Sequence, residues 1–202
     1  MTTLLGAFDC AGLAAAIAQN QAILMTTQRD LPARHRSIQT VFDHSWQKLT
    51  AREQQILGQL ALCQGRFSGP MAARYTGASL IDLTGLRYKS LLRIAEAGYY
   101  EFHPLLRSFA LAKVDATAQQ VAEAQVATLY LQLAAEQENI FYGATPQNAL
   151  RMMEGELNNL QQAWRWAERH ERTALLAQSV NAFGEYYAPA VVARRAKRSL
   201  RR

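Results

Sequence analysis

The sequence predicts a mainly helical fold that contains one small β-hairpin. Apolar residues recur at steps of three and four positions through most of the chain, as they do on the buried face of an amphipathic helix. Capping residues, prolines and glycines separate these segments at intervals that suit helices of ordinary length. Only residues 90–102, SLLRIAEAGYYEF, break the helical period, and they indicate two short strands around a turn.

Residues 1–36 are expected to form an N-terminal helix and a connector. Asp9 can cap a short helix over residues 10–19. The residue before Pro32 is pushed out of the helical region, so residues 26–36 are interpreted as the connector.

Residues 37–114 are expected to form the first domain, which begins with four helices. A continuous apolar face starts after Ser37, which opens the first of them. The pair Thr50 and Glu53 forms a capping-box pattern at the start of the second. Pro70 suits the first position of a short third helix.

The fourth helix, residues 79–88, is capped by Ser79 and is followed by the hairpin. Its inner face is expected to hold Leu80, Leu83 and Leu86. The hairpin turns at residues 96–98, and Pro104 restarts a helix. Three helices that carry a two-stranded hairpin form a winged helix, and the flanking helices would pack against it.

Residues 115–187 are expected to form antiparallel helical hairpins. A long helix over residues 116–142 is closed by Gly143, Pro146 opens the next helix, and a last helix runs from residue 173 to Tyr187. The positions expected to face inward are Val121, Val126, Leu129, Leu133 and Ile140 in the first helix, Leu150, Met153, Leu157, Leu160, Trp164 and Ala167 in the second, and Leu176, Val180 and Phe183 in the third.

The net charge of +6 is concentrated at the C-terminus. Residues 188–202 are expected to form a basic, disordered tail, which either binds phosphates or a membrane surface nonspecifically or is a solvated end. The RHR run at residues 34–36 lies before a helix start, where it either binds an anion or belongs to a solvated connector. The basic residues of the tail are Arg194, Arg195, Lys197, Arg198, Arg201 and Arg202, and without them the basic and acidic residues balance.

The cysteine usage and the hydropathy indicate a cytoplasmic protein. Cys10 and Cys63 form no CxxC pair and no metal-ligand spacing, so they are interpreted as buried free thiols in a reducing compartment. The apolar N-terminus lacks the positive start of a signal peptide. No segment reaches the roughly 18 uninterrupted apolar residues of a membrane span, so no membrane is expected as a partner.

The motifs of common catalytic sites are absent from the sequence. No glycine immediately precedes a lysine, so there is no GxxxxGK[ST] phosphate loop. HExxH and GxSxG do not occur, and the four histidines are scattered. The chain is therefore expected not to be an enzyme and to hold no cofactor or metal of its own.

DNA binding is not expected, although a winged helix can read DNA through its third core helix. Here that helix would be residues 79–88, whose charged residues are Asp82 and Arg87, and the hairpin carries Glu96 and Glu101. A DNA reader needs several basic residues aimed at phosphates, and this surface lacks them.

Five sequence blocks occur in order along the chain: RHRSIQTVFDHSW (34–46), LTAREQQILGQLAL (49–62), GASLIDLTGLRYKSLLR (77–93), YYEFHPLLRSFA (99–110) and GELNNLQQAWRWA (155–167). The first four resemble the segment that follows the nucleotide-binding core in bacterial STAND ATPases, which are large signalling ATPases related to the NB-ARC proteins. The fifth resembles the start of their tetratricopeptide-like helical region. The resemblance covers about residues 5–187.

This resemblance implies a role for His103. In the family a winged helix folds over ADP or ATP in a P-loop domain, and a Met-His-Asp motif places its histidine against the nucleotide phosphate. The matching positions here are Phe102, His103 and Pro104, so the histidine alone is retained. His103 is either a phosphate sensor that needs a P-loop domain to be present, or a cap at the junction between hairpin and helix.

The P-loop domain of the family is missing, so the resemblance implies a non-enzymatic regulatory fragment whose partner is a protein, such as a nucleotide-binding domain. Two alternatives stay open. One is a DNA-binding transcription factor that uses the winged helix and the basic tail, and the other is an inert truncated remnant.

Overall fold

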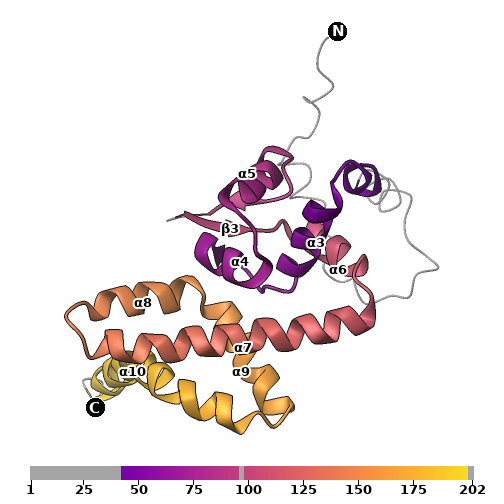
Figure 1. The fold of residues 1–202 in the computed structure, drawn as a ribbon. Helices are drawn as coiled ribbons and strands as arrows, with labels where there is room; N and C mark the ends of the chain where they lie inside the picture. The colour runs from indigo at the N-terminus through magenta and orange to yellow at the C-terminus, as the bar shows by residue number, and fades with distance from the viewer. Residues whose placement is uncertain (1–41, 96–97, 200–202) are drawn as a thin grey trace. The chain divides into compact units, whose positions relative to one another are not determined.

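The computed structural model describes residues 42–95 and 98–199 (Figure 1). The helix predicted over residues 10–19, Cys10, the connector with its RHR run, and Glu96 lie outside these residues. The chain divides after Asp43 into two units, and all labelled elements belong to the unit that starts at His44. Residues 42–47 are helical, within the helix predicted from Ser37.

A sheet domain, which we define as α3 to α6, forms the first part of this unit. Its elements in chain order are α3 (Ala51–Leu60), β1 (Phe67–Ser68), α4 (Gly69–Thr76), α5 (Leu80–Tyr88), β2 (Arg93–Ile94), β3 (Tyr99–Glu101) and α6 (Pro104–Ala112).

The capping signals of the sequence fix the starts of these helices. The Thr50 hydroxyl accepts from the Glu53 amide at 3.2 Å, and Glu53 Oε2 accepts from the Thr50 amide at 2.9 Å, so the predicted capping box is present. Ser79 caps α5 in the same way, together with Asp82. Pro70 lies in the first turn of α4 but at its second residue, because the helix begins at Gly69, one residue earlier than predicted.

Three antiparallel strands form the sheet in the order β1-β3-β2. Tyr100 at the centre pairs with Phe67 on one side and Ile94 on the other. The predicted hairpin corresponds to β2 and β3. The strand β1 was not predicted, because two residues are too short to show the alternation of a strand.

The core of the sheet domain surrounds Phe67, which is fully buried and whose ring lies 6.3 Å from Tyr100 and 6.2 Å from Phe102. On α5 the predicted inner face is right for Leu83 and Leu86 and wrong for Leu80, which is 72% exposed. The buried stripe is centred between Leu83 and Leu86, and at 3.6 residues per turn Leu80 lies about 90° away from that direction.

A helical array, which we define as α7 to α10, forms the second part. Its long helix α7 packs against each of the other three. The elements are α7 (Ala116–Phe141), α8 (Pro146–Gly155), α9 (Leu157–Arg169) and α10 (Thr173–Ser199). Its fully buried side chains include Tyr130, Leu131, Ala134, Ala149, Met153, Leu160, Ala167 and Ala182.

Three predictions for the array are wrong in detail. The helix predicted from Pro146 through Ala167 is two helices that meet at Glu156, directly after Gly155, a residue of low helix propensity, and the side chain of Glu156 contacts the sheet domain. Val121 and Val180 are 55% and 47% exposed, because small neighbours such as Ala122 and Ser179 take the buried positions. The basic tail is not wholly disordered, since α10 continues to Ser199 through a stretch rich in helix-forming Ala and Arg.

The two parts are joined by buried polar contacts. The Tyr75 hydroxyl in α4 donates to the Ala122 carbonyl in α7 at 3.3 Å, within a buried environment. None of the helices in the described part of the chain combines the length and the apolarity that a bilayer span requires.

Candidate functional site

His103, the residue that the sequence singled out, is half-buried at the start of α6. Its Nδ1 accepts a hydrogen bond from the Leu105 amide at 3.3 Å, so it caps the helix. Burial lowers the pKa of His103, and the positive charge of Arg93 lowers it further. A neutral imidazole that accepts at Nδ1 carries its proton on Nε2, and Nε2 is then the atom that can donate to a phosphate oxygen.

The neighbours of His103 lack the other two groups of the Met-His-Asp pattern. Phe102 is buried in the core of the sheet domain, and Pro104 is the first residue of α6. The geometry shows the cap directly. The phosphate-sensing role requires a nucleotide held by another domain and stays a prediction.

A polar cluster that the sequence did not predict joins the helical array to the sheet domain. Its centre is Glu156, between α8 and α9, which is fully buried. Glu156 Oε1 accepts from the Ser68 amide at 2.7 Å. Glu156 Oε2 accepts from the Tyr130 hydroxyl at 3.0 Å and from Asn159 Nδ2 at 3.1 Å. We call Glu156, Asn159, Tyr130 and the backbone of residues 64–68 the Glu156 junction.

The side-chain amide of Asn159 binds the loop before β1 through both its nitrogen and its oxygen. Its Nδ2 donates to the Arg66 carbonyl at 2.8 Å, and its Oδ1 accepts from the Gln64 amide. Arg66 returns the contact, because its Nε donates to the Gly155 carbonyl at 3.0 Å. The loop and the start of α9 therefore bind each other through backbone and side chain alike.

The donors to Glu156 are all neutral groups. The ion pairs of the described residues lie elsewhere and do not include Glu156. Burial raises the pKa of Tyr130 well above its usual value, so its hydroxyl stays protonated and donates. A buried carboxyl group with this donor set is costly to leave without its partners.

Cys63 lies beside the junction, with its Sγ 3.9 Å from the Tyr130 hydroxyl. It is buried, as predicted. Burial raises the pKa of the Cys63 thiol to about 12, so the reactive thiolate is suppressed at neutral pH. Nucleophilic chemistry is therefore not favoured at this position.

Gly155 allows the corner between α8 and α9 to approach the sheet. A Cβ atom built on Gly155 would overlap the hydroxyl and the ring of Tyr99 in β3. The Arg66 guanidinium covers the same ring, 5.2 Å from its centroid. A side chain larger than hydrogen at residue 155 would thus push the array away from β3.

The sequence contains a signal for this junction that the spacing of apolar residues alone does not reveal. Glu156 and Asn159 are polar residues at buried helical spacing, between the fully buried Met153 and Leu160. Buried polar groups in folded proteins are almost always hydrogen-bonded. A polar pair at such positions therefore indicates a specific partner.

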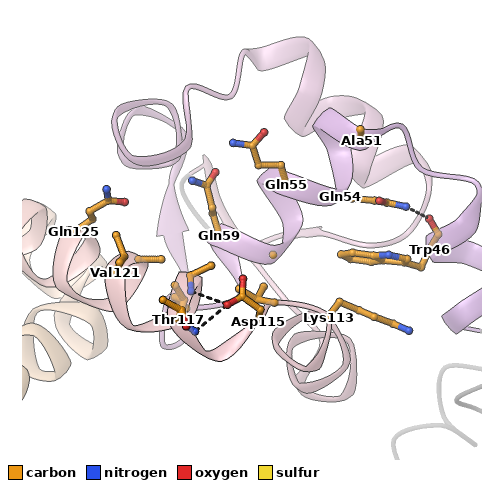
Figure 2. Close-up of a pocket in the computed structure, with 15 residues that line it drawn as sticks. Trp46, Ala51, Gln54, Gln55, Gln59, Lys113, Asp115, Thr117, Val121 and Gln125 are labelled. Atoms are coloured by element: carbon orange, nitrogen blue, oxygen red, sulfur yellow. Dashed lines mark hydrogen bonds between the residues drawn. The ribbon is translucent and has the colours of Figure 1, made fainter.

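A separate groove of about 770 Å³ lies between α3 and the turn that joins α6 to α7 (Figure 2). Its two charged residues are engaged in local contacts. Asp115 caps α7 by accepting from the Thr117 and Ala118 amides at 2.9 and 3.1 Å, and Lys113 Nζ lies 4.9 Å from the centre of the Phe109 ring. The buried Oε1 of Gln59 has no hydrogen-bond partner there.

The groove can accept a hydrogen bond from a ligand, but its lining shows no acid–base or nucleophile–base pair. In the described part of the chain, no three His, Cys, Asp or Glu side chains gather in a way that could hold a metal ion. Comparisons with protein-family models, with curated proteins and with solved structures find no match to this chain.

Proposed function

We propose that this chain is a regulatory, protein-interaction module of the STAND type that catalyses no reaction by itself. The order of helices and strands in the sheet domain, with β3 between β1 and β2, supports a winged helix. The packing of α7 against α8, α9 and α10 supports a tetratricopeptide-like array.

The Glu156 junction is the observation that carries this proposal. It fastens the start of α9 to the strand β1 through a buried group with three donors. A joint of this kind lets a displacement of the sheet domain move the array with it, which a signal-transmitting module needs.

In this proposal His103 contacts a nucleotide that another domain holds. Its Nε2–H is the donor toward a phosphate of ADP or ATP, while its Nδ1 keeps the cap of α6. The partner is then a nucleotide-binding domain with a P-loop.

DNA is the less favoured partner. The exposed surface of α5, the helix that would enter the major groove, includes the large apolar or aromatic side chains of Leu80, Ile81 and Tyr88. Apolar side chains of this size do not neutralise phosphates, which supply most of the affinity for DNA.

The proposal is tested by titrating Mg²⁺-ADP and Mg²⁺-ATP into the purified chain in a calorimeter. We expect no binding tighter than a Kd of about 10 µM, which corresponds to roughly 7 kcal/mol. A tighter Kd would show that the chain grips a nucleotide alone and would overturn the proposal. His103→Ala serves as the matched variant, and a nucleotide signal that it removes would place the unexpected site at α6.

A further inference from the structure

The outward face of α5 is the most exposed apolar surface among the described residues. Leu80, Ile81 and Tyr88 are 72%, 83% and 80% exposed. We call these three side chains the α5 face. Single exposed apolar residues are common on proteins, but three large ones on one short helix mark an interaction site.

The geometry of α5 points Ile81 and Tyr88 away from the core of the sheet domain. The buried direction runs between Leu83 and Leu86, which are 2% and 0% exposed. At 3.6 residues per turn, Ile81 and Tyr88 both lie about 180° from that direction and stand roughly 10 Å apart along the axis. Ile81 and Tyr88 therefore form an apolar line two turns long that the sheet domain does not use, and Leu80 lies about 90° to one side of this line.

Both ends of α5 are held by ion pairs, so the face is presented on a fixed support. At the N-terminal end, Arg52 contacts Asp82 at 3.0 Å and donates to the Gly77 carbonyl at 3.0 Å. At the C-terminal end, Lys89 contacts Glu53 at 2.6 Å. A surface that is already ordered loses less entropy on binding.

The size of the face favours a single helix over a second copy of this chain. A stable dimer buries about 800 Å² and roughly 20 to 30 residues on each side. The α5 face offers three anchors, which suits one amphipathic helix that contributes apolar residues at a spacing of three or four.

The charge of the face defines the partner further. Asp82 and Lys89 are compensated by Arg52 and Glu53. Arg87 belongs to none of the ion pairs of the described residues, and its guanidinium lies 5.8 Å from the centre of the Tyr88 ring. Within residues 42–95 and 98–199, therefore, no acidic side chain pairs with the positive charge that Arg87 places beside the apolar line.

From these observations we infer that the α5 face docks one amphipathic helix of a partner protein, with apolar residues on one side and a carboxylate that reaches Arg87. The inference deepens the proposed function and rests on it, because it names the surface and the chemistry through which the module binds a protein.

The test uses the full chain and three fluorescent probes. The first is a synthetic 16-residue amphipathic helix with four leucines on one side and glutamates on the flanks. The second carries lysine in place of each glutamate, and the third is a 20-base-pair DNA duplex. We expect the glutamate peptide to bind with a Kd below 100 µM, measured by fluorescence anisotropy, and more tightly than the other two.

Variants then locate the binding. I81D should weaken the glutamate peptide at least tenfold, whereas V180D, at an exposed valine of α10, should leave it unchanged. R87E should reverse the preference in favour of the lysine peptide. This charge reversal keeps the test decisive if I81D fails to fold, which circular dichroism would detect.

Four results would overturn the inference: no binding of the glutamate peptide at 1 mM, equal binding by I81D, no change of preference in R87E, or tighter binding of DNA that I81D abolishes. The nucleotide titration of the proposed function is independent of these probes. A failed peptide test with no nucleotide binding would reject the α5 face and leave the regulatory module in place.

Discussion

At the scale of single residues, His103 bears out one of its two alternative predictions, the cap at the start of α6, while its role as a phosphate sensor stays a prediction. The cap on α6 is present, and the same hydrogen bond leaves the proton of the neutral imidazole on Nε2. The sequence could predict the helix start from Pro104, whereas His103 was singled out by the resemblance to the Met-His-Asp motif. It could not predict the tautomer, which depends on the folded backbone.

The lowered pKa of His103 predicts a loss of stability on acidification. The folded state resists protonation, so the unfolded chain binds more protons once the pH falls below the ordinary histidine value of 6.5. We expect the free energy of unfolding to fall between pH 7.5 and pH 5.5, and to fall less in His103→Asn, which keeps a capping side chain. Urea unfolding at the two pH values measures this.

His44→Asn removes an imidazole outside the cap and serves as the control. Equal pH dependence in the wild type and in His103→Asn would contradict the assignment of the effect to His103.

At the scale of helices and strands, the sequence predicted where most helices start but few of the contacts between them. Helix starts are local, since Thr50, Ser79 and Pro104 act on backbone within a few residues. The buried faces of α7 and α10 are harder to predict, because small residues such as Ala134 and Ala182 occupy buried positions on them. The helical spacing of large aliphatic residues instead predicts that Val121 and Val180 face inward.

The break between α8 and α9 was unpredictable for a different reason. Leu157 and Leu160 continue the apolar spacing of Met153, so the pattern alone favours one helix. At the break, Glu156 contacts Ser68 and Tyr130, which lie far away in the sequence. Non-local hydrogen bonds of this kind leave no periodic signal.

The approach of this corner to β3 predicts a sharp effect at Gly155. Gly155→Ala should destabilise the chain by about 1–3 kcal/mol, because the new methyl group overlaps Tyr99. Chemical denaturation of both single variants and the double variant with Tyr99→Ala measures the coupling, and the combined loss should be smaller than the sum.

Gly184→Ala in α10 is the matched control, since a Cβ there meets nothing within 4 Å. It should stabilise the chain by about 0.5–1 kcal/mol through helix propensity. Additive losses in the double variant would show that Tyr99 is not the obstacle at Gly155.

At the scale of the whole molecule, we expect the Glu156 junction to make the sheet domain and the helical array unfold as one cooperative unit. Glu156→Ala removes the carboxylate that accepts from Ser68 and Tyr130, and it leaves Asn159 Nδ2 with only the Arg66 carbonyl, at a cost of about 3 kcal/mol. We expect calorimetry to show one unfolding transition for the wild type and two for this variant.

Glu154→Ala, two residues away at an exposed position, should change stability by less than about 0.5 kcal/mol. A single transition at an unchanged midpoint in Glu156→Ala would show that the two parts are held together without the junction. A monomeric wild type that melts cooperatively would also argue against an inert remnant.

Because Cys63 is buried, labelling of its thiol can report how often the contact between the sheet domain and the helical array opens. In a Cys10→Ser background it is the one thiol of the sequence, and it lies against Tyr130 with its pKa raised to about 12. An alkylating reagent can reach it only when the structure opens, so the rate of labelling reports the opening equilibrium without any denaturant. A partner that stabilises the closed contact would lower the rate of Cys63 labelling, and a partner that separates the two parts would raise it.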